Sequence, residues 1–214
     1  EYKDENEFIG NLLAEISLIK NSRIDIENFY SGVCGEEIFR DIYKKYETRL
    51  KENRLIDFDD MLSYTYELFK ERPDILALWQ NKYKYILIDE FQDINRMQYE
   101  IIKMLAAPQN NLFIVGDDDQ SIYRFRGSKP EIMLGFEKDY PNAKRILLDT
   151  NYRCGRYIVE ASLNLISHNR ERFDKKIIAA SKSKAPVTFA DFENRRDENI
   201  FLIRDIDKKI KAGA

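Results

Sequence analysis

The sequence predicts an α/β protein whose mainly parallel sheet is covered by helices on both faces. Three short apolar runs, at residues 85–88, 112–115 and 146–148, are bounded by polar residues and are too short for helices. Each is therefore predicted to be a buried strand. Helical patterns at residues 97–105 and 130–136 separate the three runs. Strands that alternate with helices are typical of parallel sheets with right-handed crossovers.

Residues 1 to about 55 carry helical periodicity and almost no strand signal. A first helix is indicated by the apolar residues Leu12, Leu13, Ile16 and Ile19. A break follows at the pairs Ser31-Gly32 and Cys34-Gly35. The next helix carries an aromatic stripe on one face, formed by Phe39, Tyr43, Tyr46 and Leu50. Such a stripe predicts core packing rather than a ligand site.

Acidic residues open the helix that comes next. The segment Asp57–Asp60 precedes an apolar pattern that runs to Phe69. Carboxylates in a first turn cap exposed amides and complement the helix dipole, so this cluster has a sufficient structural explanation. Pro73 interrupts the pattern, and a short helix at residues 76–79 leads to the first strand.

After the third run, the pattern predicts a helix at residues 157–166. A polar connection begins at about residue 170, and a strand is predicted at residues 187–189. The last helix has Ile200, Ile203 and Ile210 on one face.

Composition limits the classes of function. The 214 residues contain 35 basic and 38 acidic side chains, so a nucleic-acid site must be local rather than a property of the whole surface. Cys34 and Cys154 fit reduced thiols, and the single histidine, His168, gives too few ligands for zinc. The sequence has no membrane-spanning run and no signal-peptide pattern, so we expect a cytoplasmic location.

All three predicted strands end in polar segments. Asp89 and Glu90 follow the first, residues 116–127 the second, and residues 149–153 the third. The carboxyl ends of parallel strands meet at one edge, where ligands bind in open α/β sheets. We therefore expect these segments to converge.

Such an edge could hold a nucleoside triphosphate with its Mg²⁺. Asp89 would lie near the metal, Glu90 would orient a water, and Gln120 would sense the transferring phosphate. Arg153 would neutralise the charge that develops on that phosphate. The alternative is a strand that runs into a solvated acidic turn.

The segment from Tyr123 to Arg126 interleaves two aromatic side chains with two arginines. This combination suits single-stranded nucleic acid, because bases stack on rings while phosphates meet guanidinium groups. Taken alone, the segment is better explained by structural packing with surface charges.

Three segments together resemble helicase motifs II, III and IV of the UvrD/Rep family of superfamily 1 DNA helicases, in the order and spacing of that family. They are Ile88–Asp93, Val115–Gly127 and Asn151–Arg153. The segment Asp57–Asp60 also matches an acidic segment of the family, and residues 8–55 resemble its helical insertion subdomain. The resemblance implies a partial RecA-like P-loop NTPase sheet with that helical insertion.

The resemblance implies a role in nucleotide binding or hydrolysis for each matching position. Asp89 would bind Mg²⁺ and Glu90 would activate the attacking water. Gln120 would contact the γ-phosphate of ATP. Tyr152 would stack on adenine, and Arg153 would act as an arginine finger from the second motor domain.

The resemblance also implies contacts with DNA. Tyr123 and Phe125 would lie against bases of single-stranded DNA, and Arg126 would join the network between motif II and the nucleotide. Phe125 stands where many relatives have tryptophan, which keeps a stacking face but loses an indole donor. Thr150 stands where relatives often have glutamine, so a nucleotide contact there is in doubt.

The sequence has no Gly-Lys pair, so it has no P-loop. We therefore expect an internal fragment that is inactive alone. By the resemblance, residues 1–55 are part of the helical insertion, 56–148 the back half of the first RecA-like domain, and 149–214 the start of the second. An exposed sheet edge could also let two copies associate.

The resulting hypothesis is the central part of an ATP-dependent DNA helicase that translocates on single-stranded DNA, unwinds duplex DNA and serves DNA repair. One alternative is a non-catalytic, degenerate helicase module that binds DNA or protein. Another is a helicase fused to a nuclease.

Overall fold

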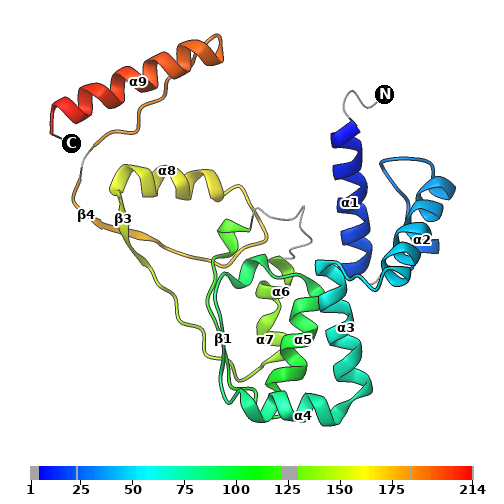
Figure 1. Ribbon diagram of the computed structural model, residues 1–214. Helices are drawn as coiled ribbons and strands as arrows, with labels where there is room; N and C mark the ends of the chain where they lie inside the picture. The colour runs from blue at the N-terminus through cyan, green and yellow to red at the C-terminus, as the bar shows by residue number, and fades with distance from the viewer. Residues whose placement is uncertain (1–4, 23, 122–129, 184, 214) are drawn as a thin grey trace. The chain divides into compact units, whose positions relative to one another are not determined.

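The chain divides into two compact units (Figure 1). The structure is a computed structural model that describes residues 5–22, 24–121, 130–183 and 185–213. The first unit consists of Glu1–Arg145 and Glu171–Phe173, and the second of Ile146–Arg170 and Asp174–Ala214. Both units contain helices and a short parallel sheet, which confirms the predicted α/β class.

The first unit begins with helices, as predicted. They are α1 (Glu5–Ser22), the 3-10 helix η1 (Ile26–Asn28), α2 (Glu36–Glu52), α3 (Phe58–Glu71) and α4 (Pro73–Lys82). A capping box starts α3: the N–H of Asp60 donates to the Asp57 side chain at 2.7 Å, and the N–H of Asp57 donates to the Asp60 side chain at 3.2 Å. The acidic segment therefore has the structural role that its position predicts.

The aromatic stripe of α2 packs in the core. Phe39 is only 1% exposed and forms a buried cluster with Ile16 and Ile19 of α1. Tyr43 and Tyr46 pack against the same cluster. This burial joins α1 to α2 and confirms the core packing predicted for Phe39, Tyr43 and Tyr46.

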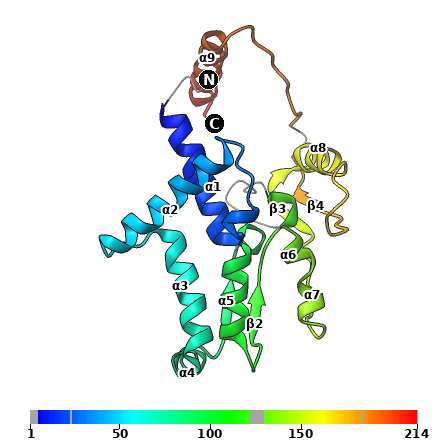
Figure 2. The ribbon, with the colours of Figure 1, turned by 90° about the vertical axis from the view of Figure 1, so that its right-hand side faces the viewer.

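The sheet of the first unit pairs β1 (Ile86–Ile88) with β2 (Leu112–Ile114) in parallel. The helix α5 (Arg96–Ala106) connects the strands, and Figure 2 shows it alongside β2. After β2 come η3 (Asp118–Gln120), α6 (Pro130–Leu134) and α7 (Phe136–Asp139). The first two predicted strands are thus confirmed, and the predicted helix at 130–136 is divided at Gly135.

Helices cover one face of this sheet, whereas the sequence predicted cover on both faces. Ile88 packs against a buried cluster that includes Tyr99 of α5 and Phe136 of α7. Figure 1 shows both helices on the same side of β1. On the other face, Leu87 is 71% exposed and Phe113 is 56% exposed. Within the described residues, nothing buries that second face.

The second unit contains a separate parallel sheet, formed by β3 (Thr150–Gly155) and β4 (Ile178–Ser181). The helix α8 (Arg156–Ile166) connects them, in agreement with the predicted helix at 157–166. The chain ends in α9 (Arg195–Lys211), also close to its prediction. No helix in the described ranges is long and apolar enough to cross a membrane.

Two predicted strands are wrong. Residues 146–148 lie outside any strand, and Ile146 and Leu148 are each 79% exposed. The strand begins at Thr150 instead, because the residues that follow find a partner in β4. Residues 187–189 are also outside any strand, while the actual strand at 178–181 was not predicted. The idea of three neighbouring strands in one sheet is therefore wrong for the described residues.

Candidate functional site

The two carboxylates that follow β1 lie on an irregular turn. The N–H of Val115 donates to Ile88 O at 2.8 Å, and the N–H of Phe91 donates to Val115 O at 2.9 Å. In a regular parallel ladder the second of these bonds would come from Glu90, so one extra residue is accommodated here. Glu90 adopts left-handed backbone angles, φ 51° and ψ 41°, which non-glycine residues seldom adopt. The turn leaves the side chains of Asp89 and Glu90 exposed.

Burial of Phe91, the residue after Glu90, holds this turn in place. Phe91 is 1% exposed and meets Tyr99 and Phe136 edge to face, with ring centroids 5.9 and 5.6 Å away. It begins the 3-10 helix η2 (Phe91–Asp93). Because Phe91 is fixed in the core, Glu90 must take the strained conformation that connects it to β1.

Asp89 has an oxygen available for a cation. Its Oδ1 accepts the N–H of Glu90 at 2.9 Å, and Oδ2 has no hydrogen-bond partner among the described residues. An exposed carboxylate oxygen is the type of ligand that Mg²⁺ takes, usually together with water and phosphate oxygens. The side chain therefore fits the metal role expected of it.

A buried glutamine connects the ends of β1 and β2. Gln92 is 2% exposed. Its Nε2 donates to Glu90 Oε2 at 2.7 Å, and its Oε1 accepts the N–H of Asp117 at 3.0 Å. The hydroxyl of Ser121 also approaches the carbonyl oxygen of Gln92 at 3.4 Å. No local sequence pattern distinguishes Gln92, and its burial beside exposed carboxylates is visible only in the structure.

Gln120 lies in the loop that Gln92 contacts. It ends η3, and its Nε2 donates to Asp117 Oδ2 at 2.8 Å. The other oxygen of Asp117 accepts the N–H of Asp119 at 3.2 Å. Asp117 therefore orients Gln120, and Gln92 in turn binds the backbone of Asp117.

An arginine that the sequence analysis also missed holds the same loop within the first unit. Arg172 donates to both oxygens of Asp119, at 2.8 and 2.7 Å, and both side chains are less than a fifth exposed. The N–H of Phe173 donates to Asp118 Oδ2 at 2.8 Å. No local pattern could have indicated these pairs, because the partners are more than 50 positions apart.

The predicted site residues do not all fall in one unit. Asp89, Glu90 and Gln120 lie in the first unit, at the carboxyl ends of β1 and β2. Tyr152 and Arg153 lie in the second unit and within β3, rather than in a loop after a strand; both are exposed, Tyr152 by 81%. The predicted DNA-contact and network residues lie outside the described residues: Tyr123, Phe125 and Arg126.

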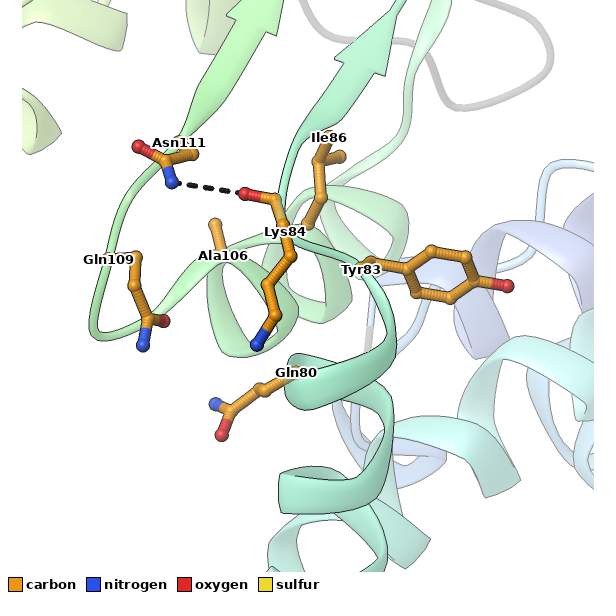
Figure 3. A pocket seen from close by; sticks show the side chains of 7 residues that line it. All are labelled: Gln80, Tyr83, Lys84, Ile86, Ala106, Gln109 and Asn111. Carbon is orange, nitrogen blue, oxygen red and sulfur yellow. Dashed lines mark hydrogen bonds between the residues drawn. The ribbon is translucent and has the colours of Figure 1, made fainter.

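Two hollows elsewhere in the first unit are poor candidates for a nucleotide site. Figure 3 shows a small pocket near the start of β1, where Asn111 Nδ2 donates to Lys84 O at 3.0 Å. Its volume of about 10 Å³ is enough for a single water. A larger groove of about 730 Å³ is lined mainly by residues of α1 and α3, including the apolar side chains Leu13, Phe58 and Met61.

The fold and this geometry define a class of protein. It is an α/β protein with exposed carboxylates and a polar loop at the carboxyl ends of neighbouring parallel strands, the position where such sheets bind ligands. Residues 2–141 match the family described as UvrD/REP helicase N-terminal domain. The chain belongs to this family, as its motifs indicated.

Individual relatives extend the match beyond residue 141. YjcD of Bacillus subtilis (strain 168) is 45% identical over 208 residues, which are 96% of this chain and 27% of YjcD. Proteins named ATP-dependent DNA helicase PcrA from Staphylococcus epidermidis and Leuconostoc citreum are 37% and 36% identical, over 96% and 91% of this chain. The chain spans about a quarter of the length of these relatives.

Proposed function

We propose that this chain is the central part of an ATP-dependent DNA helicase that moves along single-stranded DNA and unwinds duplex DNA. The observation that carries the proposal is the arrangement at the ends of β1 and β2. There, Glu90 and the loop with Gln120 are tied together through Gln92, in a chain of the UvrD/REP family. The named PcrA relatives are ATP-dependent DNA helicases, which supports the same activity here.

We assign the nucleotide chemistry of the first unit as follows. Asp89 is the proposed ligand of Mg²⁺, Glu90 orients the attacking water, and Gln120 contacts the γ-phosphate. Bound Mg²⁺ supplies charge neutralisation at the phosphates. The strands β1 and β2 would belong to a RecA-like sheet, whose parallel pairing and strand-end site they share.

We assign contacts with the nucleotide or with DNA to the remaining predicted residues. Tyr152 stacks on adenine and Arg153 neutralises the transferring phosphate, both from the second RecA-like domain. Arg126 joins the nucleotide network, and Tyr123 and Phe125 stack on bases of single-stranded DNA.

The proposed domains are the helical insertion at residues 1–55, the first RecA-like domain at 56–148 and the second at 149–214. Because the chain has no Gly-Lys pair, we expect it to hydrolyse ATP only as part of a longer protein that supplies a P-loop. Association of two copies through an open sheet edge, a cytoplasmic location and a role in DNA repair stay predictions.

The test is Glu90→Gln in the full-length protein. Removing the carboxylate that orients water should lower the kcat of DNA-stimulated ATP hydrolysis by about 100-fold or more, with little change in affinity for ATP. Glu131→Gln, in the short helix α6, is a matched control and should leave kcat unchanged. A Glu90→Gln protein with wild-type kcat would remove Glu90 from the reaction.

Single-strand binding is tested separately with Phe125→Ala. Loss of one stacking ring should weaken affinity for single-stranded DNA by about 1 to 3 kcal/mol, measured by fluorescence anisotropy. Unchanged affinity would place Phe125 off the DNA path.

The second candidate function is a non-catalytic module that binds DNA or protein. The absence of a Gly-Lys pair favours it. The reading frame upstream of Glu1 discriminates the two: a Gly-Lys-Ser/Thr segment there supports the enzyme, and a frame without one supports the module.

A further inference from the structure

We propose that Gln92 is a positioning residue that fixes the carboxylate of Glu90 and couples it to the loop that carries Gln120. This inference rests on the proposed function, in which Glu90 orients the attacking water. It concerns a side chain that is buried and would not itself touch substrate.

The orientation of the Gln92 amide follows from its partners. A backbone N–H can only donate, so the atom that faces Asp117 N at 3.0 Å must be the carbonyl oxygen Oε1. The NH₂ group must then face Glu90, where it donates to Oε2 at 2.7 Å. The two bonds therefore define each other, and flipping the amide would break both.

Close packing on the side of Gly116 restricts the amide. Gly116 lies directly against it: a Cβ built there would be 2.7 Å from Gln92 Oε1 and 3.1 Å from the backbone nitrogen of Phe91. Phe91 is itself buried at 1% exposure. The amide is thus held from the side of β2 as well as from η2.

Glu90 is consequently fixed at both ends. Its backbone is confined to the left-handed region, and its Oε2 is bound by the Gln92 amide. Its Oε1 has no hydrogen-bond partner among the described residues, so this oxygen can accept a proton from water. Without the amide, the exposed carboxylate would sample several rotamers, and the entropic advantage of a positioned base would be lost.

The same amide provides a direct connection to the phosphate sensor. The backbone N–H of Asp117 donates to Gln92, and the side chain of Asp117 accepts from Gln120. A displacement of Gln120 by the γ-phosphate would move Asp117 and, through one amide group, the carboxylate of Glu90. Water activation would then depend on phosphate occupancy.

The experiment uses Gln92→Glu in the full-length protein. This change keeps an oxygen for the Asp117 N–H and replaces the donor to Glu90 with an acceptor. We expect kcat for ATP hydrolysis to fall about tenfold or more, while KM and the affinity for a non-hydrolysable ATP analogue stay within about threefold. The control is Gln98→Glu, which adds the same charge elsewhere in the first unit. Among the described residues, the Gln98 side chain accepts the N–H of Asn95.

A swap variant gives a readout that does not depend on activity. Glu90→Gln combined with Gln92→Glu reverses donor and acceptor and restores the bond. If the two side chains pair directly, the swap should recover most of any decrease in Tm caused by Gln92→Glu alone, while ATP hydrolysis stays abolished. A swap that recovers none of a measured decrease would overturn the proposal.

The outcomes separate this inference from the proposed function. If Glu90→Gln is inactive but Gln92→Glu has a kcat within about twofold of wild type, Gln92 does not position Glu90, although the helicase assignment stands. If Glu90→Gln is itself fully active, the assignment of Glu90 fails and the role of Gln92 fails with it. Equal losses in analogue affinity and kcat would also overturn the proposal, because they indicate a general loss of the site.

Discussion

Gly116 shows how closely the site is packed at the level of single atoms. A Cβ at this position would lie 2.7 Å from Gln92 Oε1 and within 3.2 Å of two backbone nitrogens, those of Phe91 and Gln92. The amide could move, but the backbone of η2 is fixed by burial of Phe91. The site therefore requires glycine here for space rather than for backbone angles.

Gly116→Ala should accordingly loosen the site. We expect a loss of about 1 to 3 kcal/mol in the local free energy of opening, measured by hydrogen exchange at the Phe91 and Asp117 amides. Gly10→Ala is the control, because a Cβ at Gly10 meets nothing within 4 Å. In the middle of α1 that change should be neutral or slightly stabilising. Equal exchange in Gly116→Ala and wild type would contradict the packing argument.

Sequence patterns identified the exposed residues of the site but not those that hold them. Asp89 and Glu90 are indicated because carboxylates after an apolar run are conspicuous. Gln120 is indicated by its place in the polar segment after the second run and in a motif of the family. Gln92 and Arg172 act through contacts with residues distant in the chain. The left-handed backbone of Glu90 was equally invisible, since it results from burial of Phe91 and not from a turn-forming residue.

At the level of elements, a buried lysine joins α1 to α2 and to the start of α3. Lys20 Nζ lies 2.7 Å from Glu47 and Asp57 and 2.8 Å from Asp60, and its side chain is 5% exposed. Burial alone lowers the pKa of Lys20, but hydrogen bonds to the three carboxylates outweigh it and raise the pKa. For Asp57, burial raises the pKa, and hydrogen bonds from Lys20, the Asp60 backbone and Tyr46 outweigh it, so the pKa is lowered.

Lys20→Met should therefore destabilise the first unit strongly at neutral pH. It leaves three carboxylates clustered without a cation, at a cost of about 3 to 5 kcal/mol. Urea unfolding followed by the fluorescence of Trp79, the single tryptophan, measures this. Lys45→Met removes an exposed lysine whose partner is Asp41, and should cost less than about 1 kcal/mol.

The effect of Lys20→Met should shrink in acid. Because the pKa of Asp57 is lower in the folded than in the unfolded chain, the folded wild type holds fewer protons near pH 4 and loses stability as the pH falls through this range. The variant lacks that pairing, and protonation relieves the repulsion among its carboxylates. We expect the difference in free energy of unfolding to fall progressively as the pH drops below about 4, toward the lowered pKa of Asp57. A difference that grows in acid would contradict the assigned pairing.

The strands show why some elements were predicted correctly from the sequence and others were not. The apolar runs that became β1 and β2 pair with each other, so hydrophobicity and strand formation coincide. The run at 146–148 is equally apolar but has no partner strand among the described residues, whereas β3 contains the polar residues Thr150 and Asn151. A strand requires a neighbour for its backbone hydrogen bonds, and a single sequence does not show where that neighbour lies.

At the level of the whole molecule, the chain passes between the two units several times. It leaves the first unit after Arg145, returns for Glu171–Phe173 and leaves it again. The returning segment is held by the Arg172 pair with Asp119 and by the Phe173 N–H bond to Asp118, next to Gln120. Arg145 also lies over the ring of Phe173, 4.9 Å from its centroid. The residues on either side of this segment belong to the second unit, so it provides a covalent route from the loop of Gln120 to that unit.

This anchoring predicts that Arg172→Lys will release the segment although the charge is kept. A lysine cannot reproduce the two parallel bonds that guanidinium makes to Asp119, and the Phe173 amide should exchange about 10- to 100-fold faster with solvent deuterium. Arg156→Lys changes an exposed arginine whose partner is Glu160 in α8 and should leave exchange in the segment unaltered. Unchanged exchange at Phe173 would show that contacts other than those of Arg172 hold the segment.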